Sequence, residues 1–315
     1  YRTRLTHSME VSQIARTLAR FLGLNEDLSE TLSLSHDLGH TPFGHAGEEI
    51  LNKCMKNFGG FDHNVQTLRI VTLLENKYYK FHGLNLSIET LDGLIKHNGP
   101  VNELDIYKKN LEEKLFKGKI NFSNFPSLEA QVAAISDDIA YNNHDLEDGL
   151  RAGLFTIKKF SSIPFVYKLI KKHLDKIKNF RREVIVSQIV RELINLMVVD
   201  VIKTTKENLK KIKPKTVYDV YKQDHLIVDF SREIKELDKQ IKDFLKRNMY
   251  NHKKVITNTK RGQKIIKDLF MYLSRNHKRH INKDILEKNK KERAIADFIA
   301  GMTDRYAINL HKKIR

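Results

Sequence analysis

Apolar residues recur every three or four positions along most of this chain. Near its beginning they stand at Val11, Ile14, Leu18 and Phe21, and a longer run of the same spacing covers residues 184–201. An α-helix has 3.6 residues per turn, so this spacing gathers apolar side chains on one helix face. Valine-rich alternating runs, which are typical of strands, are scarce, and there are 14 glycines and 5 prolines. We therefore predict an all-α fold.

The same pattern predicts individual helices and their starts. Asn25 and Asp62 are expected to cap helices, and Thr41-Pro42 is a typical helix start, because a side-chain oxygen is followed by a ring with helical φ. The expected helices cover residues 1–22, 26–37, 63–74, 88–97, 229–247 and 261–274, together with a firm helix from Leu128 and the long one through 184–201. Residues 292–311 are expected to form a last pair of helices around Gly301. Residues 76–86 are expected to form a polar loop, and 101–126 a connection with little periodicity.

The charge balance favours anionic partners. The 315 residues include 57 Lys and Arg and 39 Asp and Glu, giving a formal charge of +18. Nucleotides, phosphate groups and nucleic acid are the partners that such a charge suits, although a lysine-rich solvated surface would look the same. The densest basic run is Lys203, Lys206, Lys210, Lys211, Lys213 and Lys215, which we interpret as a solvated helix face, with single-stranded nucleic-acid contact as the alternative.

The remaining bulk features concern the cellular compartment of the protein. Cys54 is the single cysteine, so no internal disulfide can form, which fits a reducing cytoplasm. No apolar run approaches the roughly 20 residues that span a bilayer, and no charged-then-apolar leader begins the chain. We therefore expect a cytoplasmic protein without a membrane partner. Because the sequence opens at Tyr1 without methionine, we also expect that it starts inside a longer protein.

The densest chemistry lies between His36 and Glu48. Within these thirteen residues are three histidines and two carboxylates: His36, Asp37, His40, His45 and Glu48. Imidazole nitrogens and carboxylate oxygens are the ligands of divalent cations such as Mn, Fe, Co, Ni or Zn. We interpret the stretch as half of a metal site with its catalytic wall. His45 and Glu48 are three apart on a predicted helix and so share a face.

Further candidate residues lie outside that stretch. His7 falls on the apolar side of the first helix, where it is either a hydrogen-bonded core histidine or a ligand. His63 opens a helix, whose positive end lowers a histidine pKa and favours the neutral form, although a surface histidine would look the same. Asp137, Tyr141 and Asp145 recur every four residues in an acid-rich helix. Such a row is usually solvated, yet its acidity in a basic chain suggests an adjacent cation or cationic residue.

In this order, His7, then His36-Asp37, then Asp137 resembles the H...HD...D signature of the HD superfamily of metal-dependent phosphohydrolases. The resemblance extends to bacterial deoxyguanosine triphosphate triphosphohydrolases and their dGTPase-like relatives. It rests on the segment from Arg4 to Val11, the stretch His36 to Glu48, Phe61-Asp62-His63-Asn64, the acidic helix from Asp137 to Asp148, and Ala296-Asp297-Phe298-Ile299-Ala300-Gly301-Met302-Thr303-Asp304-Arg305-Tyr306-Ala307.

What the resemblance implies can be carried over residue by residue. The metal ligands would be His7, His36, Asp37 and Asp137, where Asp137 is preferred to Asp138 because the family places its ligand four residues before the tyrosine. His45 with Glu48 would position or deprotonate water, and His40 and His63 would line the phosphate-binding side. Arg4 would contact a phosphate, and Tyr141 and Asp145 would face the sugar. One divalent ion per subunit is implied, Mn or Mg first and Fe, Co, Ni or Zn as alternatives.

The resemblance also implies a fold and an activity. We expect an HD-domain core over residues 1–154 and a helical region over 155–315 that packs on the core and contributes to oligomerisation. The expected reaction converts a dNTP and water into a deoxynucleoside and inorganic triphosphate. The resemblance also implies a homo-oligomer, a hexamer, with a dNTP activator. The alternatives are an HD hydrolase of another phosphate ester and a non-catalytic regulator that binds nucleic acid.

Overall fold

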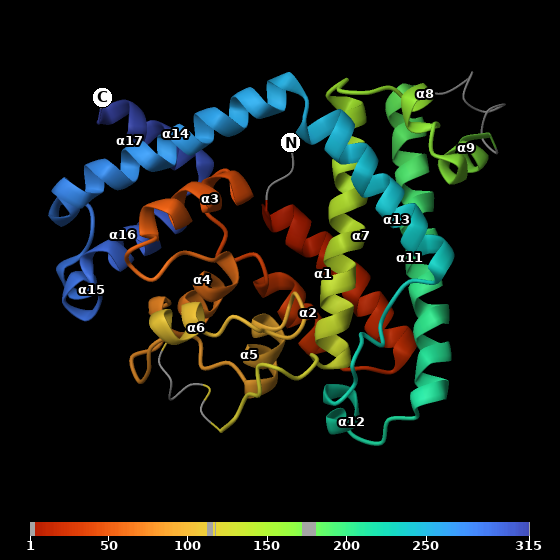
Figure 1. The fold of residues 1–315 in the computed structure, drawn as a ribbon, viewed down its shortest axis with the longest axis horizontal. Coiled ribbons are helices and arrows are strands. Elements are labelled where there is room, and N and C mark those ends of the chain that lie inside the picture. The colour runs from red at the N-terminus through yellow and green to blue at the C-terminus, as the bar shows by residue number, and fades with distance from the viewer. Residues whose placement is uncertain (1–3, 112–115, 117, 172–180, 315) are drawn as a thin grey trace. The chain divides into compact units, whose positions relative to one another are not determined.

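A computed structural model describes residues 4–111, 116, 118–171 and 181–314. Within these residues the chain forms helices, turns and loops and no strand, so the predicted all-α fold is confirmed (Figure 1). The chain divides into two compact units, each assembled from two segments. The first contains Tyr1–Leu34 and Asn124–Ile256, and the second contains Ser35–Ser123 and Thr257–Arg315. The separate division into residues 1–154 and 155–315 stays a prediction.

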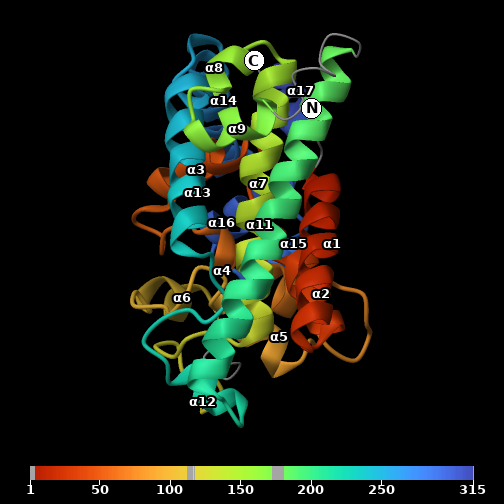
Figure 2. The same ribbon diagram turned by 90° about the vertical axis from the view of Figure 1, so that its right-hand side faces the viewer.

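Four long helices build the first unit: α1 (Arg4–Leu22), α7 (Leu128–Arg151), α11 (Arg182–Ile212) and α13 (Arg232–Leu245). Helix α7 contacts the other three, and α1 also contacts α11 (Figure 2). Their apolar faces meet in one core that is closed by Phe155, Phe160 and Phe244. Shorter elements complete the unit, namely α2 (Glu26–Ser35), α8 (Ile157–Phe160), α9 (Pro164–Lys171), α12 (Val217–Tyr221) and the π-helix η3 (Lys246–Tyr250).

The second unit has its own core. Helix α3 (Gly44–Met55) contacts α16 (Lys291–Ala300), and both bury apolar residues together with α14 (Lys253–Asn276), which begins in the first unit and continues into the second. Helix α4 (His63–Arg69) contacts α5 (Ile88–Ile95). The remaining elements are the π-helix η1 (Ile70–Leu74), α6 (Asp105–Asn110), the 3-10 helix η4 (His277–Arg279), α15 (Lys283–Lys288) and α17 (Asp304–Lys313).

A buried ion pair ties the early and late segments of the second unit together. The Arg69 guanidinium donates to both carboxylate oxygens of Asp297, at 3.1 and 2.6 Å, and to the carbonyl of Asn110 at 2.7 Å. Both charged side chains are at least nine-tenths buried. Removing one partner would leave an uncompensated buried charge, which costs about 3–5 kcal/mol. This pair therefore fixes α4, which carries His63, against α16.

Most predicted boundaries agree with the structure to within a few residues, and three predictions differ. The helix predicted over 261–274 is α14, which already begins at Lys253. The Asn25 and Asp62 side chains accept from the backbone N–H groups of Leu28 and Val65, both at 3.0 Å, as expected for caps. The Thr41-Pro42 start is wrong, because α3 begins at Gly44. The connection predicted over 101–126 contains α6, whose six residues are too few to show a periodicity.

The Thr41 hydroxyl does not cap α3 but donates to the carbonyl of Gly44 at 3.0 Å. Phe43 precedes the helix with φ of 64°, and its N–H donates to the Asp304 carboxylate at 3.0 Å. A side chain from the far end of the sequence thus takes the place of the local cap that Thr41 was expected to supply.

Candidate active site

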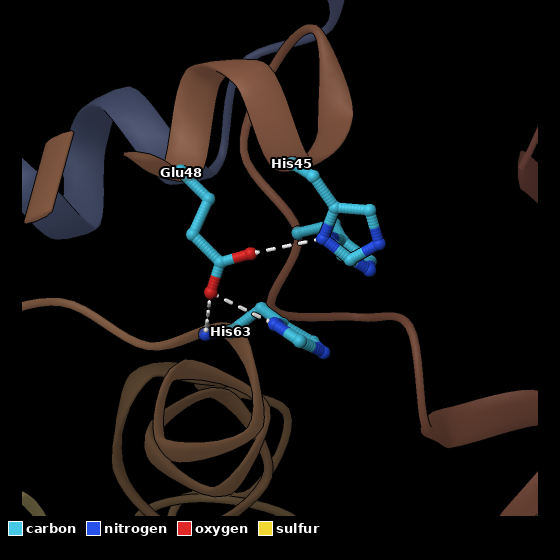
Figure 3. A group of neighbouring side chains, drawn as sticks. His45, Glu48 and His63 are labelled. Atoms are coloured by element: carbon cyan, nitrogen blue, oxygen red, sulfur yellow. Dashed lines mark hydrogen bonds and ion pairs between the residues drawn. The ribbon is translucent and has the colours of Figure 1, made fainter. Parts of the chain in front are cut away.

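Glu48 on α3 binds two histidines at once (Figure 3). One carboxylate oxygen lies 3.3 Å from His45 Nδ1, and the other lies 2.8 Å from His63 Nδ1. The second oxygen also accepts the backbone N–H of His63 at 2.8 Å. Burial opposes ionisation of Glu48, but the hydrogen bonds from His45 and His63 outweigh it and hold its pKa far below the usual range. Glu48 is therefore a carboxylate that orients two imidazoles.

Local structure explains this placement. His45 and Glu48 are three residues apart on α3, so they share a face, as predicted. The Asp62 cap starts α4 at His63 and so brings that ring to the start of a helix. Gly47 lies between His45 and Glu48 on α3, and a Cβ there would stand 2.0 Å from the carbonyl oxygen of Pro42. A glycine at this position therefore lets the helix pass close to the Pro42 carbonyl.

His40 completes the group. Its ring stacks on His63 with centroids 4.1 Å apart and an interplanar angle of 7°, and it meets the edge of His45 at 4.9 Å. Burial lowers the pKa of His40, against the opposing effect of the Asp37 carboxylate. The ligand atoms of His40, His45, Glu48 and His63 all lie within 4.8 Å of one another. His45 is the exposed member, with 71% of its side chain accessible, so it is the one that solvent reaches most freely.

His36 and Asp37 lie in the second unit with this group, and Asp37 contacts His40. The Asp37 carboxylate lies 3.3 Å from His36 Nε2 and 3.2 Å from His40 Nε2. The His36 side chain is almost fully buried, and its ring stacks on His97 with centroids 4.8 Å apart. Sequence reasoning gave His97 no task. The structure shows that it packs against a predicted ligand, a contact 61 positions away in sequence that no local pattern could reveal.

The other two predicted ligands form a pair in the first unit. His7 on α1 and Asp137 on α7 are joined by Nε2 and Oδ1 at 2.9 Å, and both side chains are more than two-thirds buried. His7 therefore faces a carboxylate rather than an apolar core. The neighbouring Asp138 instead meets Lys242, at 3.1 Å.

The donor atoms suit a divalent ion. Two ligand atoms that bind one ion at right angles, each about 2.1 Å away, lie about 3 Å apart. The separations of 2.9 Å in the pair of His7 with Asp137 and 3.3 Å in the pair of His36 with Asp37 match this value. Neutral imidazoles with carboxylates are ligands that Mn, Fe, Co, Ni and Zn accept. Each pair therefore fits as half of a metal site.

The residues predicted to face the sugar lie on α7. Tyr141 meets the ring of His7 edge-on at 6.4 Å, and Asp145 accepts a hydrogen bond of 2.5 Å from the Tyr250 hydroxyl. Burial raises the pKa of Asp145, partly offset by the Tyr250 hydrogen bond, and burial and Asp145 both raise the pKa of Tyr250. Tyr250 was missed, because it belongs to the π-helix η3, 105 residues from its partner. Arg4 is exposed at the start of α1.

Two family models of phosphohydrolase-type domains match this helical chain. The HD domain model matches residues 4–142, and the phosphohydrolase-associated domain model matches residues 228–313. The first match contains all the residues predicted for the site except Asp145, which lies three residues beyond its end. The second contains Tyr250 and the helices α14, α16 and α17.

Curated relatives match the whole chain. A Pelagibacter ubique protein is 57% identical over 314 residues, which are all of this chain and 84% of the relative. Proteins of Parvibaculum lavamentivorans and Bartonella henselae are 45% and 46% identical, again over all of this chain and over 82% and 81% of their own lengths. All three are named deoxyguanosinetriphosphate triphosphohydrolase-like protein. The chain belongs to this family, and the predicted resemblance is confirmed.

Two further expectations concern a membrane and nucleic acid as partners. None of the described helices combines the length and the apolar character that a bilayer crossing requires. The six lysines of the run between 203 and 215 are all exposed, as expected for a solvated helix face. Contact of this run with nucleic acid stays a prediction.

Proposed function

We propose that the protein is a metal-dependent dNTP triphosphohydrolase, which converts a dNTP and water into a deoxynucleoside and inorganic triphosphate. Membership of the family and the names of the relatives support this reaction. The observation that carries it is the single carboxylate of Glu48 that holds the Nδ1 atoms of His45 and His63. Two oriented imidazoles next to further histidines and carboxylates suit hydrolysis of a phosphate ester.

The hydrogen bonds of Glu48 decide which nitrogen of each ring can react. A carboxylate can only accept, so Nδ1 of His45 and of His63 carries the proton. The Nε2 atom of a neutral ring is then a lone-pair acceptor. The nearby negative charge also stabilises the protonated ring. We therefore assign His45, the exposed ring, as the base that takes a proton from water, and Glu48 as the residue that orients it.

The proposed reaction balances as one displacement. The water oxygen bonds to the α-phosphorus as His45 takes its proton, and the bond from that phosphorus to the 5′-oxygen breaks. The electron pair goes to the 5′-oxygen, which takes up a proton and leaves as the deoxynucleoside. Attack at this phosphorus leaves the three phosphates joined as triphosphate.

We propose that His7, Asp137, His36 and Asp37 together hold one divalent ion per subunit, Mn or Mg first and Fe, Co, Ni or Zn as alternatives. The support is the spacing of donor atoms within each pair and the order of the four residues in the sequence. When bound, such an ion polarises a phosphate oxygen and stabilises developing negative charge.

The remaining site residues receive substrate roles in the same proposal. His40 and His63 lie face to face and would line the phosphate side. Arg4 would contact a phosphate with its guanidinium, which suits bidentate binding of phosphate oxygens. Tyr141 and Asp145 would face the deoxyribose, with the Asp145 carboxyl as a hydrogen-bonding partner of a sugar hydroxyl. From family resemblance and the single cysteine we further propose a cytoplasmic homo-oligomer, a hexamer, that a dNTP activates.

Product analysis tests this function. The purified protein is incubated with Mn²⁺ or Mg²⁺ and each dNTP in turn, and the phosphate products are separated by ion exchange. Inorganic triphosphate with an equal amount of deoxynucleoside is the expected result. Pyrophosphate or orthophosphate would instead indicate an HD hydrolase of a different class, and the absence of turnover with every dNTP would favour the non-catalytic regulator.

A further inference from the structure

A loop of the second unit carries aromatic and basic side chains that the proposed reaction does not use. Residues 76–82, which we call the aromatic loop, read Asn-Lys-Tyr-Tyr-Lys-Phe-His, and all seven are exposed. Tyr79 is 94% exposed, Tyr78 54% and Phe81 38%. Large aromatic side chains gathered in water in this way commonly mark a binding surface.

The base of the aromatic loop is fixed to the helix before it. The N–H of Gly83 donates to the carbonyl of Glu75 at 2.9 Å, and the N–H of Leu84 donates to that of Val71 at 2.7 Å. Gly83 has φ of 70°, and a Cβ there would stand 2.5 Å from the Val71 carbonyl oxygen. Only glycine lets the chain return this closely to the helix. The aromatic residues therefore project from a closed base rather than from an open strand of chain.

The chemistry of the loop suits an aromatic anion. Lys77, Lys80 and His82 alternate with the aromatic residues, and no acidic residue occurs between Glu75 and Glu89. The Tyr78 and Phe81 rings lie 4.8 Å apart, and the Lys80 ammonium lies 5.6 Å from the centre of the Tyr79 ring. Nucleic-acid bases stack on such rings, and lysines at this spacing meet backbone phosphates.

We propose that the aromatic loop is a stacking platform for single-stranded nucleic acid. The bases would stack on Tyr79 and on the pair of Tyr78 and Phe81, while Lys77 and Lys80 contact phosphates. A single strand is favoured over a duplex because only unpaired bases offer their faces to a protein ring. A second copy of the aromatic loop is disfavoured as the occupant, because the loop itself is basic.

A comparison within the chain supports this choice of surface. The lysine run between 203 and 215 ends near Tyr218, which is also 66% exposed. There the acidic Asp219 follows directly, and the Tyr218 ring lies edge-on to Tyr221 at 5.9 Å. That region offers one exposed aromatic ring directly before an acid. The aromatic loop offers three exposed rings, and its neighbouring acid, Glu75, lies before the loop and 3.7 Å from Lys77.

The absence of tryptophan from the sequence allows a direct test. The variant Tyr79→Trp places a single tryptophan in the loop, and Tyr218→Trp serves as the matched control. We expect unlabelled dT and U oligonucleotides of about 15 residues to quench the Tyr79→Trp emission, more strongly at low salt, and to leave that of Tyr218→Trp unchanged. A duplex of the same length should quench neither.

Affinity measurements by anisotropy of a labelled dT oligonucleotide complete the test. We expect Tyr79→Ala to weaken binding roughly 5- to 150-fold, since one stacked base is worth about 1–3 kcal/mol. Lys77→Gln with Lys80→Gln should lower the slope of log affinity against log salt by about 1.4. Binding that is absent at about 50 mM salt, or unchanged in all these variants, overturns the proposal. So does a sedimentation coefficient that falls in Tyr79→Ala, because the loop would then join copies of the chain.

Discussion

Replacing Glu48 by glutamine tests the carboxylate that organises the site. Glutamine has nearly the same shape but only one acceptor oxygen, so it can accept from His45 or His63 and not from both. Its amide group then faces the other Nδ1, which must lose its proton and present the wrong tautomer. A hydrogen bond to a charged group contributes about 1.5–3 kcal/mol, and at least one is lost.

We expect kcat of the Glu48→Gln enzyme to fall by about 10²- to 10⁴-fold, the range typical of general-base catalysis and of a histidine that loses its orienting carboxylate. Initial rates of triphosphate release give kcat, and elemental analysis gives metal content, which should not change. The matched control is Glu49→Gln, one residue further on the same helix, where the ion pair to Lys53 is exposed and worth little. A kcat of Glu48→Gln within about threefold of wild type would refute the reasoning.

The same pair of proteins has a predicted pH dependence. The pKa of Glu48 is lowered from 4.5 in the folded chain, so its stabilising effect is present above that value and is lost as the pH falls below it. The melting temperature of wild type should therefore exceed that of Glu48→Gln near pH 7, and the gap should narrow between about pH 4.5 and 3. A gap of constant size would show that the ionised carboxylate does not stabilise the fold.

Other substitutions test separate contacts. Tyr250→Phe removes the donor to Asp145 and should raise KM for dNTP several-fold with a smaller effect on kcat; an unchanged KM would argue against a sugar role for this pair. His36→Ala should lose bound metal, whereas His45→Ala should retain the metal and lose turnover. Elemental analysis measures the metal content of both variants, and triphosphate release measures turnover. Metal loss in His45→Ala would show that His45 is a ligand. Gly47→Ala should be destabilised by about 1–3 kcal/mol, because its Cβ meets a backbone oxygen; an unchanged melting temperature would contradict that packing.

Local features of the fold could be predicted because short segments determine them. The spacing of apolar residues follows from helix geometry, and the caps at Asn25 and Asp62 involve residues three positions apart. The pair of His45 and Glu48 is also local, since three residues on a helix face the same way. The start of α3 failed as a prediction because Phe43 takes a left-handed conformation and binds Asp304, 261 residues later. No local rule contains such a partner.

The candidate site could be predicted as a set of residues more readily than as a set of contacts. The sequence indicated that Glu48 serves His45, but the structure adds His63, which meets Glu48 only because α3 and α4 lie together. Tyr250 escaped notice because an isolated tyrosine in a basic segment carries no signal of a carboxylate 105 residues away. The stacking of His97 on His36 was missed because the two residues are also far apart in the sequence. Long-range packing, not residue type, decides these contacts.

Hydrolysis in H₂¹⁸O with dGTP and Mn²⁺ tests the central claim most directly. Attack of water on the α-phosphorus places one ¹⁸O in the released triphosphate and none in deoxyguanosine, and mass spectrometry of both products reads this out. We expect labelled triphosphate and unlabelled nucleoside, with the rate lost in His45→Ala. Label in the nucleoside, or release of pyrophosphate in place of triphosphate, would contradict the account.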